Sequence, residues 1–137
     1  PAGPRLERLA NEGRLSKIAP FKLPTSVKGQ ELNFSGPEAA AKRAVAEGKD
    51  PRALAQGIES CIANSLGDIL KCAIGKMGLG RVLVVGGVAA NEFIRGELRR
   101  AAAGWNGQIA FASPKLSSDN AVGVAAFGLW KSGHFGY

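Results

Sequence analysis

The sequence is poor in the residues that build metal sites and disulfide frameworks. Its 137 residues include one histidine and two cysteines. His134 stands near the last residue of the sequence with no Cys/His cluster beside it, which excludes a self-contained metal site. Cys61 and Cys72 lie eleven residues apart within one expected helix, about three turns from each other, which excludes a disulfide between them. We therefore expect two reduced, packed thiols, as in a cytosolic protein.

Long hydrophobic runs are missing as well. No apolar run approaches the roughly twenty residues that a membrane span needs, and no signal-peptide pattern is present. We expect no membrane association and a cytoplasmic location. The first residue is Pro1 rather than methionine, and the sequence opens in what we interpret as a turn. These two features predict a segment of a longer protein.

Acidic residues are outnumbered by basic ones. Eighteen Lys and Arg stand against eleven Asp and Glu, and the formal net charge is +7. This excess is compatible with a polyanionic partner such as RNA, although charge alone favours the simpler role of keeping the protein soluble. The 45% hydrophobic content, with charges of both signs, indicates a globular chain with one core.

The first third of the chain predicts short elements. Residues 4–10 have the pattern of a short helix that begins at a proline. Residues 21–27 and 31–34 predict the two arms of a hairpin. A further helix is expected to start with Ser35 as its capping residue and to end near Gly48.

The rest of the chain predicts an α/β arrangement. Residues 52–77 have apolar positions at three- and four-residue steps, which indicates one long helix with a single buried stripe. Buried parallel strands are expected at 82–85 and 108–112, each followed by a helix, the last starting near Asp119. The expected stripe comprises Leu54, Ile58, Ile62, Leu66, Ile69, Leu70, Ala73 and Met77.

The most informative feature is the glycine pair Gly86-Gly87 at the end of the first of these strands. Glycines let a ligand approach bare backbone, and a helix N-terminus directly behind them would offer free N–H groups. Relief of strand-to-helix packing explains the two glycines equally well. Asn91 could simply cap the following helix, and from the residues alone an ordinary cap is the favoured reading of Asp119.

Four ordered motifs resemble one known family. Gly-Gly-Val-Ala-Ala-Asn at 86–91 is followed by Ile94-Arg95 and later by Ser-Asp-Asn-Ala at 118–121. Upstream, Pro-Ala-Gly-Pro at 1–4 and Asn-Phe-Ser-Gly at 33–36 stand in the same order as in that family. The chain resembles the C-terminal lobe of the tRNA threonylcarbamoyladenosine synthase family, the tRNA N6-adenosine threonylcarbamoyltransferases, formerly called O-sialoglycoprotein endopeptidase or glycoprotease.

The resemblance implies a fold and a reaction. The fold would be part of a ribonuclease-H-like lobe of the actin, sugar kinase and Hsp70 (ASKHA) superfamily. Residues 1–50 would form a helical and hairpin subdomain of the C-terminal lobe, and residues 51–137 an α/β nucleotide-binding core with two strand-turn-helix units. The family moves a threonylcarbamoyl group from an adenylate to the adenosine beside the anticodon of tRNAs that read A-starting codons.

The same resemblance implies site residues and partners. Gly3, Gly86, Gly87 and Asn91 match nucleotide- or substrate-binding positions, Asp119 matches a metal-ligand aspartate, and no catalytic residue is implied. The full-length protein would hold one divalent metal of the iron or zinc type, with two histidines of an N-terminal His-x-x-x-His motif, and an adenine nucleotide. We expect neither to bind this segment tightly. The implied partners are the missing N-terminal lobe, tRNA and threonylcarbamoyl-adenylate, with a homodimer possible through the exposed cleft face.

Departures from the family pattern leave a second function open. Pro37-Glu38-Ala39 stands where the family usually has Leu-Lys-Thr, and Ala2 replaces a glycine. A non-catalytic paralogue that serves as a nucleotide-binding or dimerising scaffold protein is therefore the alternative to a transferase, and we expect the isolated segment to be inactive. Peptidase chemistry is disfavoured because the chain has no Ser/His/Asp, Cys/His or zinc-protease constellation.

Overall fold

The expected α/β class is confirmed by a small parallel sheet. The computed structural model describes residues 2–28, 31–105, 107–113 and 131. Strands β3 and β4 pair in parallel, with Val82 opposite Ile109. The helix expected near Asp119 lies outside the described residues. In chain order the elements are α1 (Ala2–Leu15), β1 (Val27–Lys28), β2 (Glu31–Leu32), α2 (Ser35–Ala46), α3 (Pro51–Met77), β3 (Arg81–Val84), the 3-10 helix η1 (Gly87–Ala90), α4 (Glu92–Ala102) and β4 (Gln108–Phe111).

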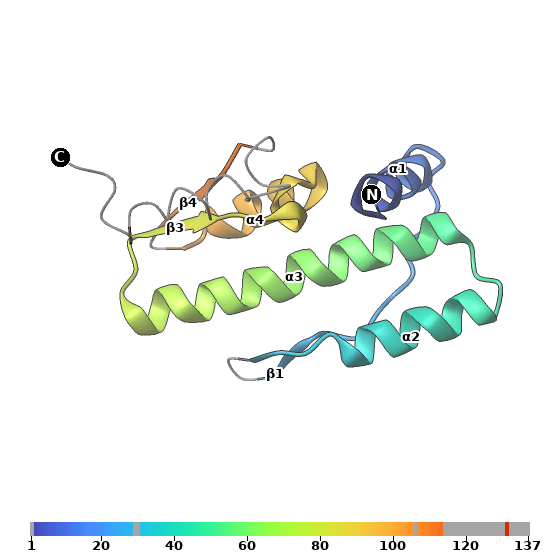
Figure 1. Cartoon of the computed structure of the whole chain (residues 1–137), viewed down its shortest axis with the longest axis horizontal. Coiled ribbons are helices and arrows are strands. Elements are labelled where there is room, and N and C mark those ends of the chain that lie inside the picture. Colours follow the sequence, from blue (N-terminus) through green and yellow to red (C-terminus); the bar gives the residue numbers. More distant parts are fainter. Residues whose placement is uncertain (1, 29–30, 106, 114–130, 132–137) are drawn as a thin grey trace.

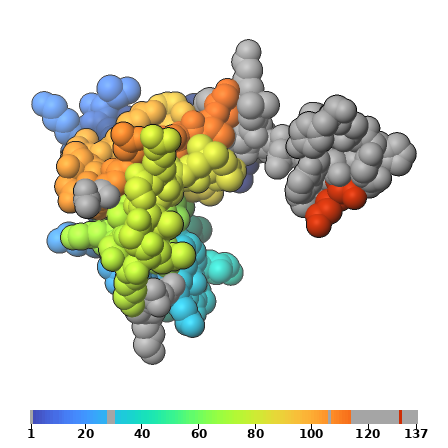
Figure 2. Space-filling model, turned by 90° about the vertical axis from the view of Figure 1, so that its left-hand side faces the viewer, coloured from blue at the N-terminus to red at the C-terminus, as the bar shows by residue number. Residues whose placement is uncertain are grey.

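Helix α3 forms the middle layer of the described structure. Helices α1 and α4 and the strand pair β3–β4 lie on one side of it, and α2 and the β1–β2 hairpin lie on the other (Figure 1). Figure 2 looks onto the C-terminal end of α3 and shows the same order, with α4 and β4 in orange above the green helix α3 and the cyan start of α2 below it. Helix α3 therefore packs against elements that precede it in the chain and against elements that follow it.

The bounds of α3 follow from local residue chemistry. Asp50 is the N-cap, and its Oδ1 accepts a hydrogen bond of 2.8 Å from the backbone N–H of Arg52. Pro51 occupies the first turn, where its missing N–H costs nothing. Gly78 ends the helix in the left-handed conformation, at φ 62°. The expected helix over 52–77 is thus confirmed to within a residue.

The cap at Asp50 predicts a pH-dependent contribution to stability. Hydrogen bonds from the Arg52 side chain hold the pKa of the Asp50 carboxyl below its ordinary value of 3.8. A carboxyl with a lowered folded-state pKa stabilises the fold above its unfolded-state pKa, and this stabilisation fades as the pH falls through the folded-state value. Asp50→Asn keeps a capping oxygen but loses the charge. We expect its melting temperature to lie below that of the wild type at neutral pH, and the gap to close in acid. A gap that stays constant from pH 7 to pH 2 would contradict this.

The single buried stripe expected on α3 is wrong. Four consecutive residues, 54–57, are all buried, whereas Met77 is 69% exposed. Ile58, Ile62 and Leu66 are only half-buried. The physical reason is that α3 contacts elements on two opposite sides, so small and polar residues between the apolar positions are covered as well.

Two expected helix starts also differ from the structure. The turn expected at residues 1–4 is wrong, because α1 already begins at Ala2 and tolerates Pro4 in its first turn. Ser35 is the first residue of α2 rather than its cap. Asn33 Oδ1 instead accepts hydrogen bonds from the Ser35 backbone N–H at 2.9 Å and from its hydroxyl at 2.6 Å. The Asn33 side chain, two residues before Ser35, therefore accepts the hydrogen bonds at the start of α2.

The segment between α1 and the hairpin runs along α3 and is bonded to it. The Phe21 N–H donates to the Ala53 carbonyl at 2.9 Å, and the Cys61 thiol donates to the Pro24 carbonyl at 3.3 Å. Burial raises the pKa of the Cys61 thiol, and no disulfide joins Cys61 to Cys72. Only the ends of the expected hairpin arms next to the turn form strands, namely Val27–Lys28 and Glu31–Leu32. Backbone groups of Ile18, Phe21 and Pro24 are hydrogen-bonded to α3 instead.

The strand β3 is not buried on both faces by the described residues. Val82 and Val84 are half-buried, whereas Leu83 is 65% exposed. Ile109 and Phe111 of β4 pack against Ile94 and Leu98, so α3 and α4 cover one face of the strand pair. The strand expected from the apolar run is therefore confirmed, whereas its burial is confirmed for one face only. Within the described residues, no helix is long and apolar enough to cross a membrane.

Candidate functional site

The glycine turn behind β3 has the open backbone that the sequence predicts. Gly86 adopts φ 98°, a conformation that side chains rarely allow. A methyl group added at Gly86 or Gly87 would meet no described atom within 4 Å. Relief of local packing is therefore not the reason for these glycines in the described structure. The backbone conformation explains Gly86, and among the described residues nothing fills the space beside the two glycines, which leaves room there for a ligand.

The helix does not follow the turn directly. The short helix η1 occupies Gly87–Ala90, and α4 begins only after Asn91. Two N–H groups of the first turn of α4 are already used, since Glu92 N donates to Glu7 Oε1 at 2.8 Å and Ile94 N donates to Asn91 Oδ1 at 2.9 Å. The free helix N-terminus expected from the sequence is thus partly occupied by the protein itself.

Asn91 is held at both ends of its amide group. Its Oδ1 caps α4, which confirms the capping role considered for it. Its Nδ2 donates a hydrogen bond of 2.6 Å to Glu59 Oε1 on α3. An asparagine amide has two donor hydrogens and two lone pairs, so one of each stays available. Asn91 can therefore cap the helix and contact a ligand at the same time.

Glu59 is a fully buried carboxylate paired with Arg14. Its side chain is 0% exposed, and Arg14 Nη1 lies 2.8 Å from its Oε2, although without the alignment of a hydrogen bond. The Arg14 guanidinium also lies over the ring of Phe93, 4.3 Å from its centroid. The pair thus joins α1, α3 and α4 directly beneath Asn91.

Arg95 ties the turn to the end of β4. Its guanidinium donates to the Ala89 carbonyl of η1 and to the Ala112 carbonyl after β4, at 2.5 Å each. The residue is 7% exposed, and its guanidinium lies 5.3 Å from the ring centroid of Phe111. The Gly86-Gly87 turn and the second strand end are therefore fixed relative to each other.

Of the other site residues expected from the family resemblance, Gly3 lies within the described residues and Asp119 does not. Gly3 is exposed on α1, one helical turn before Glu7, whose carboxylate reaches the start of α4. This places one side of α1 beside Asn91. Asp119 lies outside the described residues. Among those described, no three His, Cys, Asp or Glu residues gather as a metal site would require. The described residues thus do not fit a metal on their own.

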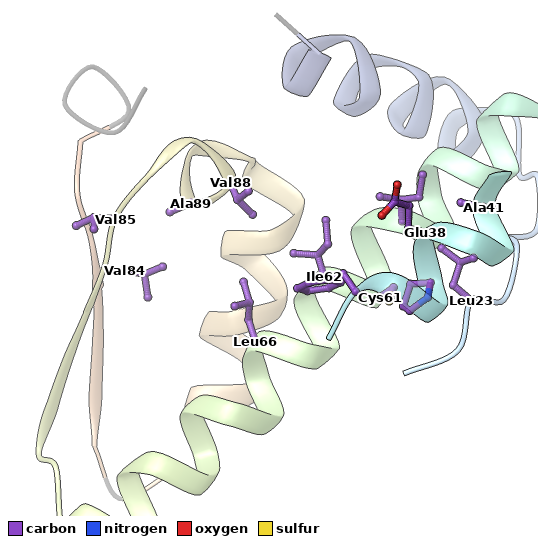
Figure 3. Close-up of a pocket in the computed structure, with 13 residues that line it drawn as sticks. Leu23, Glu38, Ala41, Cys61, Ile62, Leu66, Val84, Val85, Val88 and Ala89 are labelled. Carbon is purple, nitrogen blue, oxygen red and sulfur yellow. The ribbon is translucent and has the colours of Figure 1, made fainter. Parts of the chain in front are cut away.

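An apolar groove lies beside the Gly86-Gly87 turn, lined by residues of α2, α3 and β3. It has a volume of about 600 Å³, and Ile62 and Leu66 of α3 line it together with Val85 and Val88, which flank the glycine pair (Figure 3). Glu38 is the one charged residue among the described residues that line it. A groove of this composition cannot hold phosphate or ribose by hydrogen bonds. The polar groups beside the turn are instead the Asn91 amide and the turn backbone.

Sequence reasoning missed Glu59, Arg95 and Glu7. Glu59 stands one residue after Ile58 of the apolar set of α3, so the apolar spacing gives no sign that it is buried. Its burial depends on Arg14, which lies 45 positions away in the chain. Arg95 stood within a quoted motif, but its contacts depend on the position of β4. Only the three-dimensional arrangement shows that these side chains share one site.

Comparisons with known proteins identify the family of this chain. The family model for tRNA N6-adenosine threonylcarbamoyltransferase matches residues 1–126. The chain is 31% identical over 129 residues to the enzyme of that name from Methanopyrus kandleri, covering 94% of this chain and 36% of that protein. It is 33% identical over 137 residues to the enzyme of the same name from Archaeoglobus fulgidus, covering 98% of this chain and 41% of that protein. The chain thus spans well under half the length of these relatives.

Two further likenesses concern a longer protein and the fold. A probable bifunctional tRNA threonylcarbamoyladenosine biosynthesis protein of Methanocaldococcus jannaschii is 33% identical over 129 residues, which make up 23% of its length. The crystal structure of T. kodakarensis HypF superposes with a TM-score of 0.68 over 96% of this chain and 17% of that chain, at 24% identity, a likeness of fold alone. Because the family model covers residues 1–126, the chain belongs to the tRNA N6-adenosine threonylcarbamoyltransferase family.

Proposed function

We propose that this chain supplies the adenine-nucleotide contacts of a transferase that forms threonylcarbamoyladenosine in tRNA. One observation carries the proposal: Asn91 is fixed at the start of α4, beside a glycine turn that no described side chain fills. Family membership gives that site its ligand class. Gly86, Gly87, Asn91 and Gly3 are the proposed nucleotide-binding residues.

The polar groups at the turn are suited to the sugar and phosphates of a nucleotide. Bare backbone at Gly86 and Gly87 permits close approach, and Asn91 keeps one N–H donor and one lone pair for a ligand. Arg95 holds the turn in place through two backbone carbonyls. These residues would bind and orient the nucleotide, and none of them is placed to act as a nucleophile or a general base.

The rest of the machinery would come from outside this segment. The chain covers 36% and 41% of two relatives, so the remaining lobe of a ribonuclease-H-like cleft, tRNA and threonylcarbamoyl-adenylate belong to the proposal for the longer protein. Asp119 stays a predicted metal ligand, and a divalent metal there would supply charge neutralisation when bound. Cytoplasmic location and a homodimer through the cleft face also stay predictions.

Calorimetric titration of ATP into the chain tests this proposal. We expect weak, saturable binding by the wild type and at least a tenfold loss in Asn91→Ser. Serine keeps a capping oxygen but lacks the amide, so the helix start is preserved while the ligand contact is lost. Asn64→Ala changes an exposed asparagine on α3 and serves as the matched control. Equal binding by Asn91→Ser and wild type, or no binding by a folded wild type, would contradict the proposed function.

A further inference from the structure

We propose that Glu59 is a positioning residue that sets which hydrogen-bonding groups Asn91 presents to the nucleotide. The inference rests on the proposed function, because it assigns the ligand contact to Asn91. Glu59 lies 32 positions before Asn91, on a different helix, and its Oε1 accepts the Asn91 Nδ2 hydrogen bond at 2.6 Å. Glu59 itself is fully buried and cannot touch a ligand.

The two contacts of Asn91 fix the direction of its amide. Ile94 N is a donor, so it must face the amide oxygen, which it does at 2.9 Å. The Glu59 carboxylate is only an acceptor when ionised, so it must face the amide nitrogen. A flipped amide would lose both bonds and place its oxygen against a buried negative charge. The remaining N–H and lone pair are therefore held in one orientation before any ligand arrives, which reduces the ordering cost of binding.

The network explains why a carboxylate and an arginine are buried here. A buried pair of charges adds little net stability, since the loss of hydration offsets most of the attraction. A hydrophobic pair of similar size would fill the same space between α1 and α3 but could not accept a bond from Asn91. Arg14 Nη1 lies 2.8 Å from Glu59 Oε2, so the pair as a whole carries no net charge that would repel an anionic ligand nearby. The charges thus serve the orientation of Asn91.

A double variant separates positioning from folding. Arg14→Met/Glu59→Met removes both charges, keeps the volume and leaves no unpaired buried ion, so the fold is retained. Arg8→Met/Glu12→Met removes an exposed ion pair from the same helix α1 and is the matched control. Circular dichroism and melting curves establish that each variant is folded before the site is probed.

The first readout needs no ligand. In protein labelled with 15N-asparagine, we expect the two Nδ2 protons of Asn91 to be widely separated in chemical shift and protected from exchange, because one is bonded to a carboxylate. Asn91→Ser assigns the signal by removing it. The separation should collapse to that of exposed amides in Arg14→Met/Glu59→Met and persist in Arg8→Met/Glu12→Met. An unshifted, rapidly exchanging pair in the wild type, or no change in the double variant, would overturn the proposal.

The second readout is a double-mutant cycle, in which the ATP affinities of the variants are compared. We expect Arg14→Met/Glu59→Met to bind about tenfold more weakly than wild type, roughly the worth of one oriented hydrogen bond. In the Asn91→Ser background the same double change should have no further effect, because Glu59 acts through Asn91. Additive losses, or unaltered affinity in the double variant, would overturn the positioning role. A wild type that binds no ATP contradicts the proposed function, whereas the amide signal still decides whether Glu59 holds Asn91.

Discussion

Replacing Gly57 with alanine is expected to lower the free energy of unfolding by about 3 kcal/mol. Gly57 is a buried residue of α3, and a methyl group added there would lie 2.1 Å from the Phe21 carbonyl oxygen and 3.0 Å from the carbonyl carbon. No methyl group fits at such distances, so the backbone of Phe21 would have to move. Its N–H bond of 2.9 Å to the Ala53 carbonyl would then be lost too.

Gly75 offers a matched control within the same helix. A methyl group added at Gly75 would meet nothing within 4 Å in the described structure. Because alanine has a higher helix propensity than glycine, Gly75→Ala should raise the free energy of unfolding by up to about 1 kcal/mol. Urea denaturation of both variants checks the prediction. Equal effects of the two substitutions would show that segment 18–26 does not lie against α3.

Arg14→Met alone is expected to cost about 3–5 kcal/mol of unfolding free energy. The change leaves Glu59 fully buried and without its positive partner. It also removes the guanidinium from the face of Phe93, which lies 4.3 Å away. Burial of an uncompensated charge is among the largest penalties that one substitution can impose.

The double variant Arg14→Met/Glu59→Met should recover most of that loss. With both charges gone, the two methionines fill the same volume between α1 and α3 without a buried ion. Arg8→Met, which breaks an exposed pair with Glu12, should change the free energy of unfolding by less than about 1 kcal/mol. Thermal and urea melts check all three variants. A double variant as unstable as Arg14→Met would argue that the ion pair itself is needed for folding.

Helix ends were predictable from sequence where the signal is local. The start of α3 at Pro51 follows from an acidic cap and a first-turn proline, and its end follows from Gly78. The expected capping role of Ser35 is wrong because Asn33 and Ser35 are both good capping residues, and only the backbone path shows that Asn33 accepts the N–H of Ser35. The parallel pairing of β3 with β4 was predictable from two apolar runs separated by a helix.

Features that depend on distant contacts could not be predicted from the sequence. The buried face of α3 was misjudged because apolar spacing shows one stripe, whereas the helix is covered from two sides (Figure 1). The burial of Glu59 requires Arg14 and Asn91, which come from helices that a local pattern cannot bring together. The glycine turn was found because its signal is local, namely two glycines at the end of an apolar run.

An NMR titration of the 15N-labelled chain with ATP tests most directly whether the glycine turn and the start of α4 hold the nucleotide. The account predicts that the backbone amides of Gly86, Gly87 and Glu92 shift first and saturate together, along with the Asn91 side-chain amide. Shifts confined to the apolar groove around Ile62 and Leu66, or no saturable shift at the turn, would contradict it.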